Sequence, residues 1–218
     1  MTHIKNNIAS WLILTALFAT PSAFSSSNNT DKIRTSTVGG DPVAGKKKSQ
    51  ICQGCHGVDG NSNSELIPKL AGQYEDYISK QMRNYLAGTR SHEIMNGMAA
   101  PLNEKDVSDI SAYFANQTIM KGNGSAPNKK GQDIYLKGNI SEMVMTCVYC
   151  HGEGGKGIDR YTAMYPVIGG QQKAYLLKQL TDFREDNRVN SPNIIMNKIV
   201  KSLSDSELKA LAEYLSVQ

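Results

Sequence analysis

Two short stretches of the chain, CQGCH at residues 52–56 and CVYCH at residues 147–151, share one pattern: two cysteines three positions apart, with a histidine directly after the second. This is the attachment pattern of a c-type haem. The two thiols must lie about one helical turn apart to add to the two vinyl groups on one edge of a porphyrin, and the adjacent histidine then reaches the iron. The sequence therefore predicts two covalently bound haem c groups. The residues predicted to form thioether bonds to haem are Cys52, Cys55, Cys147 and Cys150. The residues predicted to bind iron are His56 and His151.

Three other uses of these cysteines compete with haem attachment. A thioredoxin-type CxxC needs a βαβ context, which neither site shows. A Cys2His2 zinc site is disfavoured because adjacent cysteine and histidine side chains do not readily close on one metal. Two disulfides would suit an exported protein with four cysteines, but they leave unexplained why two of only four histidines follow them. We therefore adopt haem attachment as the interpretation.

The chain also aligns with itself. Residues 68–90 match residues 166–188 without gaps, 98 positions later, and residues 102–117 match residues 203–218, 101 positions later. Apolar residues recur in these segments every three or four positions, which is typical of one face of a helix. In the first pair of segments, the identical residues include Gly72 and Gly170, Gln73 and Gln171, Tyr77 and Tyr175, Lys80 and Lys178, Gln81 and Gln179, and Arg90 and Arg188.

The closing helix of each half has a start signal. Ser204 followed by Glu207 predicts a capping box, and Asn103 with Asp106 is a weaker version of it. Each half is therefore expected to hold an attachment helix, a loop with Gly and Pro, a middle helix, a methionine loop and a closing helix.

The repeat selects one methionine in each half as the second iron ligand. Met95 aligns with Met196, whereas Met98 aligns with an isoleucine. Because a histidine-ligated iron takes a thioether on its other face in many electron-transfer cytochromes, Met95 and Met196 are the predicted axial ligands. Methionine is also a common filler of apolar cores, and this alternative stays open. His92 is a conceivable rival ligand, but the second half has an asparagine at the matched position.

The chain is expected to divide into four segments. A cleaved signal peptide is predicted at residues 1–25, where Lys5 precedes an apolar run too short for a comfortable membrane span; a retained anchor is the alternative. Two domains are expected at residues 40–120 and 132–218, joined by a linker rich in Gly, Asn and Lys at 121–131. An all-α domain this small has a thin core, which an inserted haem would complete.

Over about residues 40–218 the chain resembles cytochrome c4, the dihaem class I cytochromes c of bacteria. The resemblance rests on both CxxCH motifs together with PKLAGQ, YISKQM, MNGMAAPL, GGQ and YLLKQLTDFRE. It implies an all-α fold of two tandem class I cytochrome c domains, each wrapped around one covalently bound haem, related by pseudo-twofold symmetry and with the haem propionates facing at the interface. It also implies that the carbonyls of Pro68 and Pro166 accept a hydrogen bond from the ligand histidines. Arg90 and Arg188 either neutralise propionates or are ordinary surface charge.

The expected function is that of a periplasmic electron carrier and not of an enzyme. His/Met ligation of both irons favours electron transfer, and the resemblance implies a quinol-oxidising complex as donor and a cytochrome oxidase or other acceptor. A dihaem peroxidase and an electron-donating subunit of a larger oxidoreductase are the alternatives, and a peripheral membrane association is left open. The net charge of +4 and the absence of a basic run longer than three lysines argue against a nucleic-acid partner.

Overall fold

The computed structural model of the protein describes residues 39–158 and 164–218. The predicted signal peptide, residues 1–25, lies outside the described residues. Within the two described ranges, no helix is long and apolar enough to cross a membrane. Both halves of the repeat belong to a single compact unit, residues 35–218.

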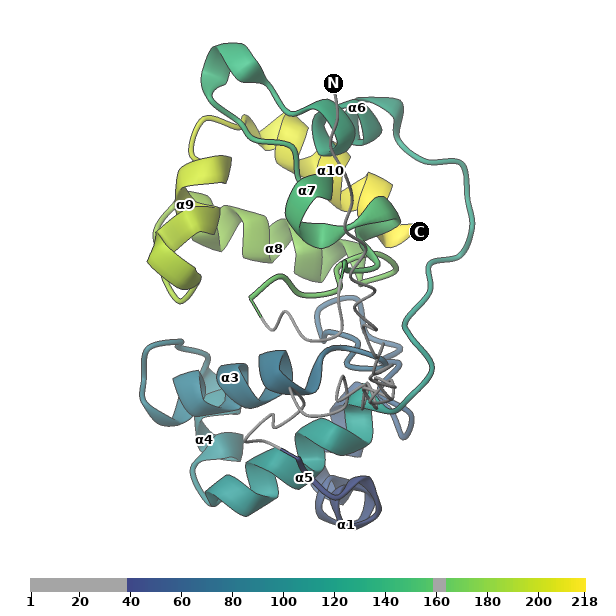
Figure 1. Ribbon diagram of the computed structural model, residues 1–218, viewed down its shortest axis with the longest axis vertical. Coiled ribbons are helices and arrows are strands. Elements are labelled where there is room, and N and C mark those ends of the chain that lie inside the picture. The colour runs from purple at the N-terminus through teal and green to yellow at the C-terminus, as the bar shows by residue number, and fades with distance from the viewer. Residues whose placement is uncertain (1–38, 159–163) are drawn as a thin grey trace, which may run out of the picture. The chain divides into compact units, whose positions relative to one another are not determined.

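The first half is built from helices that Figure 1 shows packed around one another. The first of these begins directly after Asp41, whose carboxylate accepts hydrogen bonds from the backbone N–H groups of Val43 and Ala44. The last begins with the predicted capping box of Asn103 and Asp106. The helices of this half are α1 (Pro42–Lys48), α2 (Gln50–His56), α3 (Glu75–Leu86), α4 (Glu93–Ala99) and α5 (Glu104–Ala115).

The second half repeats this order with a longer connection before its attachment motif. Its first helix begins at Lys129, inside the segment expected as the linker, and its last begins with the predicted capping box of Ser204 and Glu207. Short 3₁₀ turns occur at Ile140–Glu142, Glu153–Gly155 and Pro192–Ile194. The helices of this half are α6 (Lys129–Lys137), α7 (Val148–His151), α8 (Lys173–Arg184), α9 (Ile195–Val200) and α10 (Asp205–Ser216).

The first and last helices of each half cross at a glycine. A Cβ built on Gly45 in α1 would overlap the carbonyl oxygen of Asp109 in α5. In the second half, a Cβ on Gly131 in α6 would overlap the carbonyl oxygen of Ala210 in α10. Because any side chain at these positions would force the helices apart, the crossing requires glycine in both halves.

The apolar stripes predicted from the sequence form the two cores. In the first half, Ile78, Met82 and Tyr85 of α3 pack with residues of α5. In the second half, Leu176 and Phe183 of α8 pack with residues of α6 and α10. The all-α fold is confirmed, since the described residues contain helices and turns and only an isolated β-bridge at residues 139 and 144.

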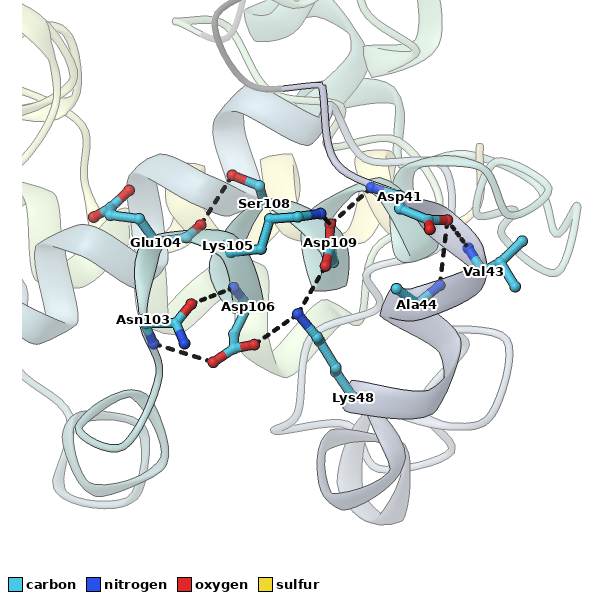
Figure 2. A network of polar contacts seen from close by, with 10 residues as sticks. All are labelled: Asp41, Val43, Ala44, Lys48, Asn103, Glu104, Lys105, Asp106, Ser108 and Asp109. Atoms are coloured by element: carbon cyan, nitrogen blue, oxygen red, sulfur yellow. Dashed lines mark hydrogen bonds and ion pairs between the residues drawn. The ribbon is translucent and has the colours of Figure 1, made fainter.

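In the first half, a polar network around a buried carboxylate fastens α1 to α5 (Figure 2). The carboxylate of Asp109 is 1% exposed and accepts hydrogen bonds from Lys48 Nζ at 2.8 Å, Lys105 Nζ at 2.6 Å and the backbone N–H of Asp41 at 2.8 Å. The matched position in the second half is Ala210, so the two halves stabilise the same helix crossing by different means.

Candidate functional site

A cavity of about 460 Å³ runs through both halves and collects nearly all of the predicted site residues. Cys52 is the exception, since it is partly buried and packs against the apolar core of the first half. The other predicted residues lining the cavity are Cys55, His56, Met95, Cys147, Cys150, His151 and Met196.

Both motif histidines are buried and held in one orientation. The Nδ1 atom of His56 lies 2.9 Å from the carbonyl oxygen of Pro68, and that of His151 lies 2.9 Å from the carbonyl oxygen of Pro166. A carbonyl can only accept, so Nδ1 carries the proton and Nε2 keeps its lone pair. Burial lowers the pKa of both histidines, although these hydrogen bonds act in the opposite direction. Both imidazoles are therefore neutral near pH 7 and able to bind a metal through Nε2.

The two aligned methionines lie on short helices at the cavity. Met95 is on α4 and Met196 on α9, and both line the cavity, whereas Met98 is not among the lining residues in the described part of the chain. The backbone N–H of Met95 donates to Nδ1 of His92 at 3.4 Å, and that of Met196 donates to the hydroxyl of Ser191 at 3.2 Å. His92 thus acts as the N-cap of the helix that carries Met95.

Two arginines lie at the contact between the halves. Arg90 and Arg188 are 9% and 8% exposed, so the interpretation of either as ordinary surface charge is wrong. The guanidinium of Arg90 donates across the contact to the hydroxyl of Tyr175 at 3.1 Å and to Oε1 of Gln179 at 2.8 Å. In the mirrored arrangement, Arg188 donates to the hydroxyl of Tyr77 at 3.1 Å and to the side-chain oxygen of Gln81.

These guanidiniums have neutral partners. Among residues 39–158 and 164–218, neither forms an ion pair with a carboxylate, and the side-chain nitrogen Nε2 of the neighbouring Gln81 is buried without a hydrogen-bond partner. Burial and the charges of Arg188 and Arg90 lower the pKa of Lys80, which also lines the cavity. A buried positive cluster with spare donors fits the carboxylates of a haem, and the neutral imidazoles fit its iron.

A second set of mirrored contacts uses glutamine. Gln73 donates to the carbonyl of Val167 at 2.8 Å and accepts from its N–H at 3.0 Å. Gln171 makes the same pair of bonds with Lys69, at 2.9 Å and 2.8 Å. Residues 69 and 167 are themselves matched in the repeat, so each half uses the same surface to bind the other. This is an isologous contact, and it confirms the pseudo-twofold relation of the halves.

The role of these polar residues was missed in the sequence, although their signal was present. Glutamine, tyrosine and arginine recur at matched positions within the middle helices and directly beside them. If these helices served only to fold their own domain, the two halves would need to match in their apolar residues but not in their polar ones. Polar identity between the halves therefore pointed to a contact that both halves make.

The fold and the site define a tandem of helical domains, each with a CxxCH motif, a buried neutral histidine and a methionine on one cavity. Comparisons with known proteins agree. The family model described as cytochrome c matches residues 42–118 and 129–217. Cytochrome c4 of Pseudomonas aeruginosa is 41% identical over 179 residues, which are 81% of this chain and 88% of that protein.

Two further relatives extend the comparison. The crystal structure of reduced recombinant cytochrome c4 from Pseudomonas stutzeri superposes with a TM-score of 0.76 at 38% identity, over 81% of this chain and 98% of that one. A thiosulfate dehydrogenase electron acceptor of Stutzerimonas stutzeri is 32% identical over 173 residues, which are 77% of this chain and 79% of that protein. The chain belongs to the cytochrome c family and, within it, to the dihaem cytochromes c4. It is a dihaem c-type electron carrier whose two CxxCH motifs fit haem attachment.

Proposed function

We propose that the first haem is tethered by Cys52 and Cys55 and that its iron is held between His56 and Met95. The two thiols are three residues apart on α2, about one helical turn. The imidazole of His56 is buried with Nδ1 bonded to Pro68 and lines the cavity, and α4 brings Met95 to the same cavity. The thioether of methionine is a ligand that raises the potential of a haem.

The second haem is held in the same way by Cys147 and Cys150, with His151 and Met196 on its iron. All four side chains line the cavity, and the repeat relates His151 and Met196 to their counterparts in the first half. The guanidiniums of Arg90 and Arg188, which have no carboxylate partner within the described ranges, are assigned to the propionates.

The function that this site supports is electron transport by an exported carrier. When bound, haem c supplies one-electron redox chemistry, and the protein's part is to cover both faces of the ring. With one histidine and one methionine assigned to each iron, a substrate would find no free ligand position, which favours a carrier over a dihaem peroxidase. The observation that carries this proposal is the pairing of one buried neutral histidine and one methionine on the cavity in each half.

We assign the carrier to the periplasm, between a quinol-oxidising complex and a terminal oxidase or other acceptor. The periplasmic assignment rests on the signal-like residues 1–25, and the partners rest on the similarity to cytochromes c4. The similarity to thiosulfate dehydrogenase electron acceptors favours a second donor, an oxidoreductase of sulfur compounds. Stopped-flow reduction by each purified donor separates the two: faster reduction by the thiosulfate enzyme than by the quinol-oxidising complex would replace the first assignment with the second.

Replacing either predicted methionine ligand tests the site. In the ferric holoprotein, Met95→Ala and Met196→Ala should each convert one of two low-spin centres into a centre that binds cyanide rapidly, and leave the other unchanged. Met98→Ala is the matched control, since Met98 lies on the same helix as Met95 but is not assigned to the cavity. A Met95→Ala or Met196→Ala protein with the optical and magnetic spectra of the parent would refute the ligand assignment, and rapid cyanide binding by the parent would favour a peroxidase.

A further inference from the structure

The two attachment motifs are supported differently by the chain that precedes them. In the first half, α2 follows α1 after Ser49 alone, and the backbone N–H of Gln53 donates to the carbonyl of Ser49 at 2.9 Å. The motif is therefore part of a helix that continues from α1. In the second half, residues 138–147 separate α6 from α7, and α7 covers only Val148–His151. A one-turn helix after a long excursion has few hydrogen bonds of its own to fix its position.

Tyr135 of α6 holds both ends of this second motif. Its backbone carbonyl accepts a hydrogen bond from the N–H of Cys147 at 3.0 Å, at the first residue of the motif. Its hydroxyl donates to the carbonyl oxygen of Gly152, directly after His151. The side chain is completely buried, its ring lines the cavity, and it packs against the ring of Tyr214 at 5.3 Å between centroids.

The first half has no tyrosine at this place. The glycine crossings align Gly45 with Gly131, so the residue matched to Tyr135 is Ser49, which is also completely buried. Its hydroxyl donates to the carbonyl of Lys46, within its own helical turn. A tyrosine hydroxyl does reach the chain after His56, but it comes from Tyr113 on α5 and binds the carbonyl of Val58.

We propose that Tyr135 is a positioning residue for the second haem, acting through the hydrogen bond from its hydroxyl to Gly152. The bond ties the end of the CVYCH motif to α6 and, together with the hydrogen bond of His151 to Pro166, sets the plane of the His151 imidazole. In the first half, the continuation of α1 into α2 holds the attachment motif in place instead. The inference rests on the proposed function, in that His151 is taken to be an iron ligand.

The test is Tyr135→Phe in the holoprotein, which removes the hydroxyl and keeps the buried ring. We expect a shift in the low-spin electron paramagnetic resonance signal and in the reduction potential of the second haem only, because imidazole orientation and hydrogen bonding affect both quantities. Met95→Ala and Met196→Ala identify which signal belongs to which haem. Tyr113→Phe should shift the signal of the first haem instead.

Tyr214→Phe is the matched control, since it removes a hydroxyl from the other ring of the pair, which is not bonded to Gly152 in the described residues. Unchanged signals and potentials in Tyr135→Phe, or equal shifts in Tyr214→Phe, would overturn the inference. If Tyr135→Phe fails to retain the second haem, 4-aminophenylalanine at position 135 restores a donor: recovery of that haem supports the hydrogen bond, and continued loss rejects it. Two low-spin His/Met signals in the parent test the proposed function separately.

Discussion

At the scale of single residues, Asp109 is a buried charge that three donors hold in place. Its carboxylate is 1% exposed and accepts from two lysines and a backbone N–H (Figure 2). Burial acts to raise its pKa, but the hydrogen bonds from Lys105, Lys48 and Asp41 outweigh burial and hold the pKa well below its usual range. Asp109 is therefore charged in the folded protein at all ordinary pH values, and its charge links α1 to α5.

Removing this charge should weaken the first half. In Asp109→Asn the free energy of unfolding at pH 7 should fall by about 2 kcal/mol, because a charge with three donors is lost. In the parent, the contribution of Asp109 is complete above about pH 4 and is lost as the pH falls further, because the unfolded carboxyl takes up its proton first. The variant should lack this acid dependence. Denaturant unfolding of the holoprotein at pH 7 and pH 3 measures both effects.

The control for this prediction is Asp133→Asn. Asp133 also pairs with two lysines, Lys129 and Lys137, but it is 39% exposed on the surface of α6. Exposed pairs contribute little because water screens them, so the variant should unfold at the same denaturant concentration as the parent. Equal stabilities for the two variants would show that burial of Asp109 has no energetic consequence.

At the scale of helices, the first and last helix of each half can approach closely only because the residue at their crossing is a glycine, which has no side chain. Gly45→Ala and Gly131→Ala should each destabilise their own half by about 1–3 kcal/mol, since a methyl group would press on the backbone of the opposite helix. Gly97→Ala in α4 is the control, because a Cβ there meets nothing within 4 Å and alanine favours helix.

Thermal unfolding followed by circular dichroism, together with haem content, checks this prediction. We expect Gly45→Ala to lower the melting temperature of the transition assigned to the first half, and Gly131→Ala that of the second. If either variant melts at or above the temperature of Gly97→Ala, the close approach of the helices does not limit stability.

At the scale of the whole molecule, the two halves are joined by contacts that the repeat duplicates. Gln73 and Gln171 are each 5% exposed and each bind both backbone groups of a residue in the other half. Arg90 and Arg188 cross the contact in the same mirrored way. The two haem sites therefore share one buried polar contact, and the relative placement of the halves depends on it.

The double variant Gln73→Ala and Gln171→Ala should loosen this contact. Four hydrogen bonds between the halves are lost and buried backbone groups are left without partners, so the halves should separate in solution while each retains its haem. NMR relaxation should report a shorter rotational correlation time for each half. Proteolysis within residues 121–128 should be faster than in the parent. Gln117→Ala is the control, because among residues 39–158 and 164–218 that side chain bonds only to Tyr113 of its own half. Unchanged tumbling and cleavage in the double variant would mean that other contacts hold the halves together.

Much of the fold could be predicted because it depends on neighbours in the chain. The apolar stripes of α3 and α8 and the two capping boxes involve residues three or four positions apart, and the structure contains them all. The second domain was expected to begin at residue 132, because the Gly- and Lys-rich composition of residues 121–131 is typical of a linker, but α6 already begins at Lys129. There the side chain of Asn128 caps the helix by accepting from the N–H of Gly131.

The sequence by itself predicted the chemistry of the site, since each CxxCH motif is a local pattern whose spacing suits haem c and the repeat matches one methionine in each half. Only the tertiary structure decided how the halves meet, and it showed Arg90 to be buried against Tyr175, 85 residues away. Such a contact depends on which helix faces lie together, and that depends on packing over the whole chain. For the same reason, the bond from Tyr135 to Gly152 depends on the tertiary structure, because residues 138–147 fold so that the second motif lies against α6.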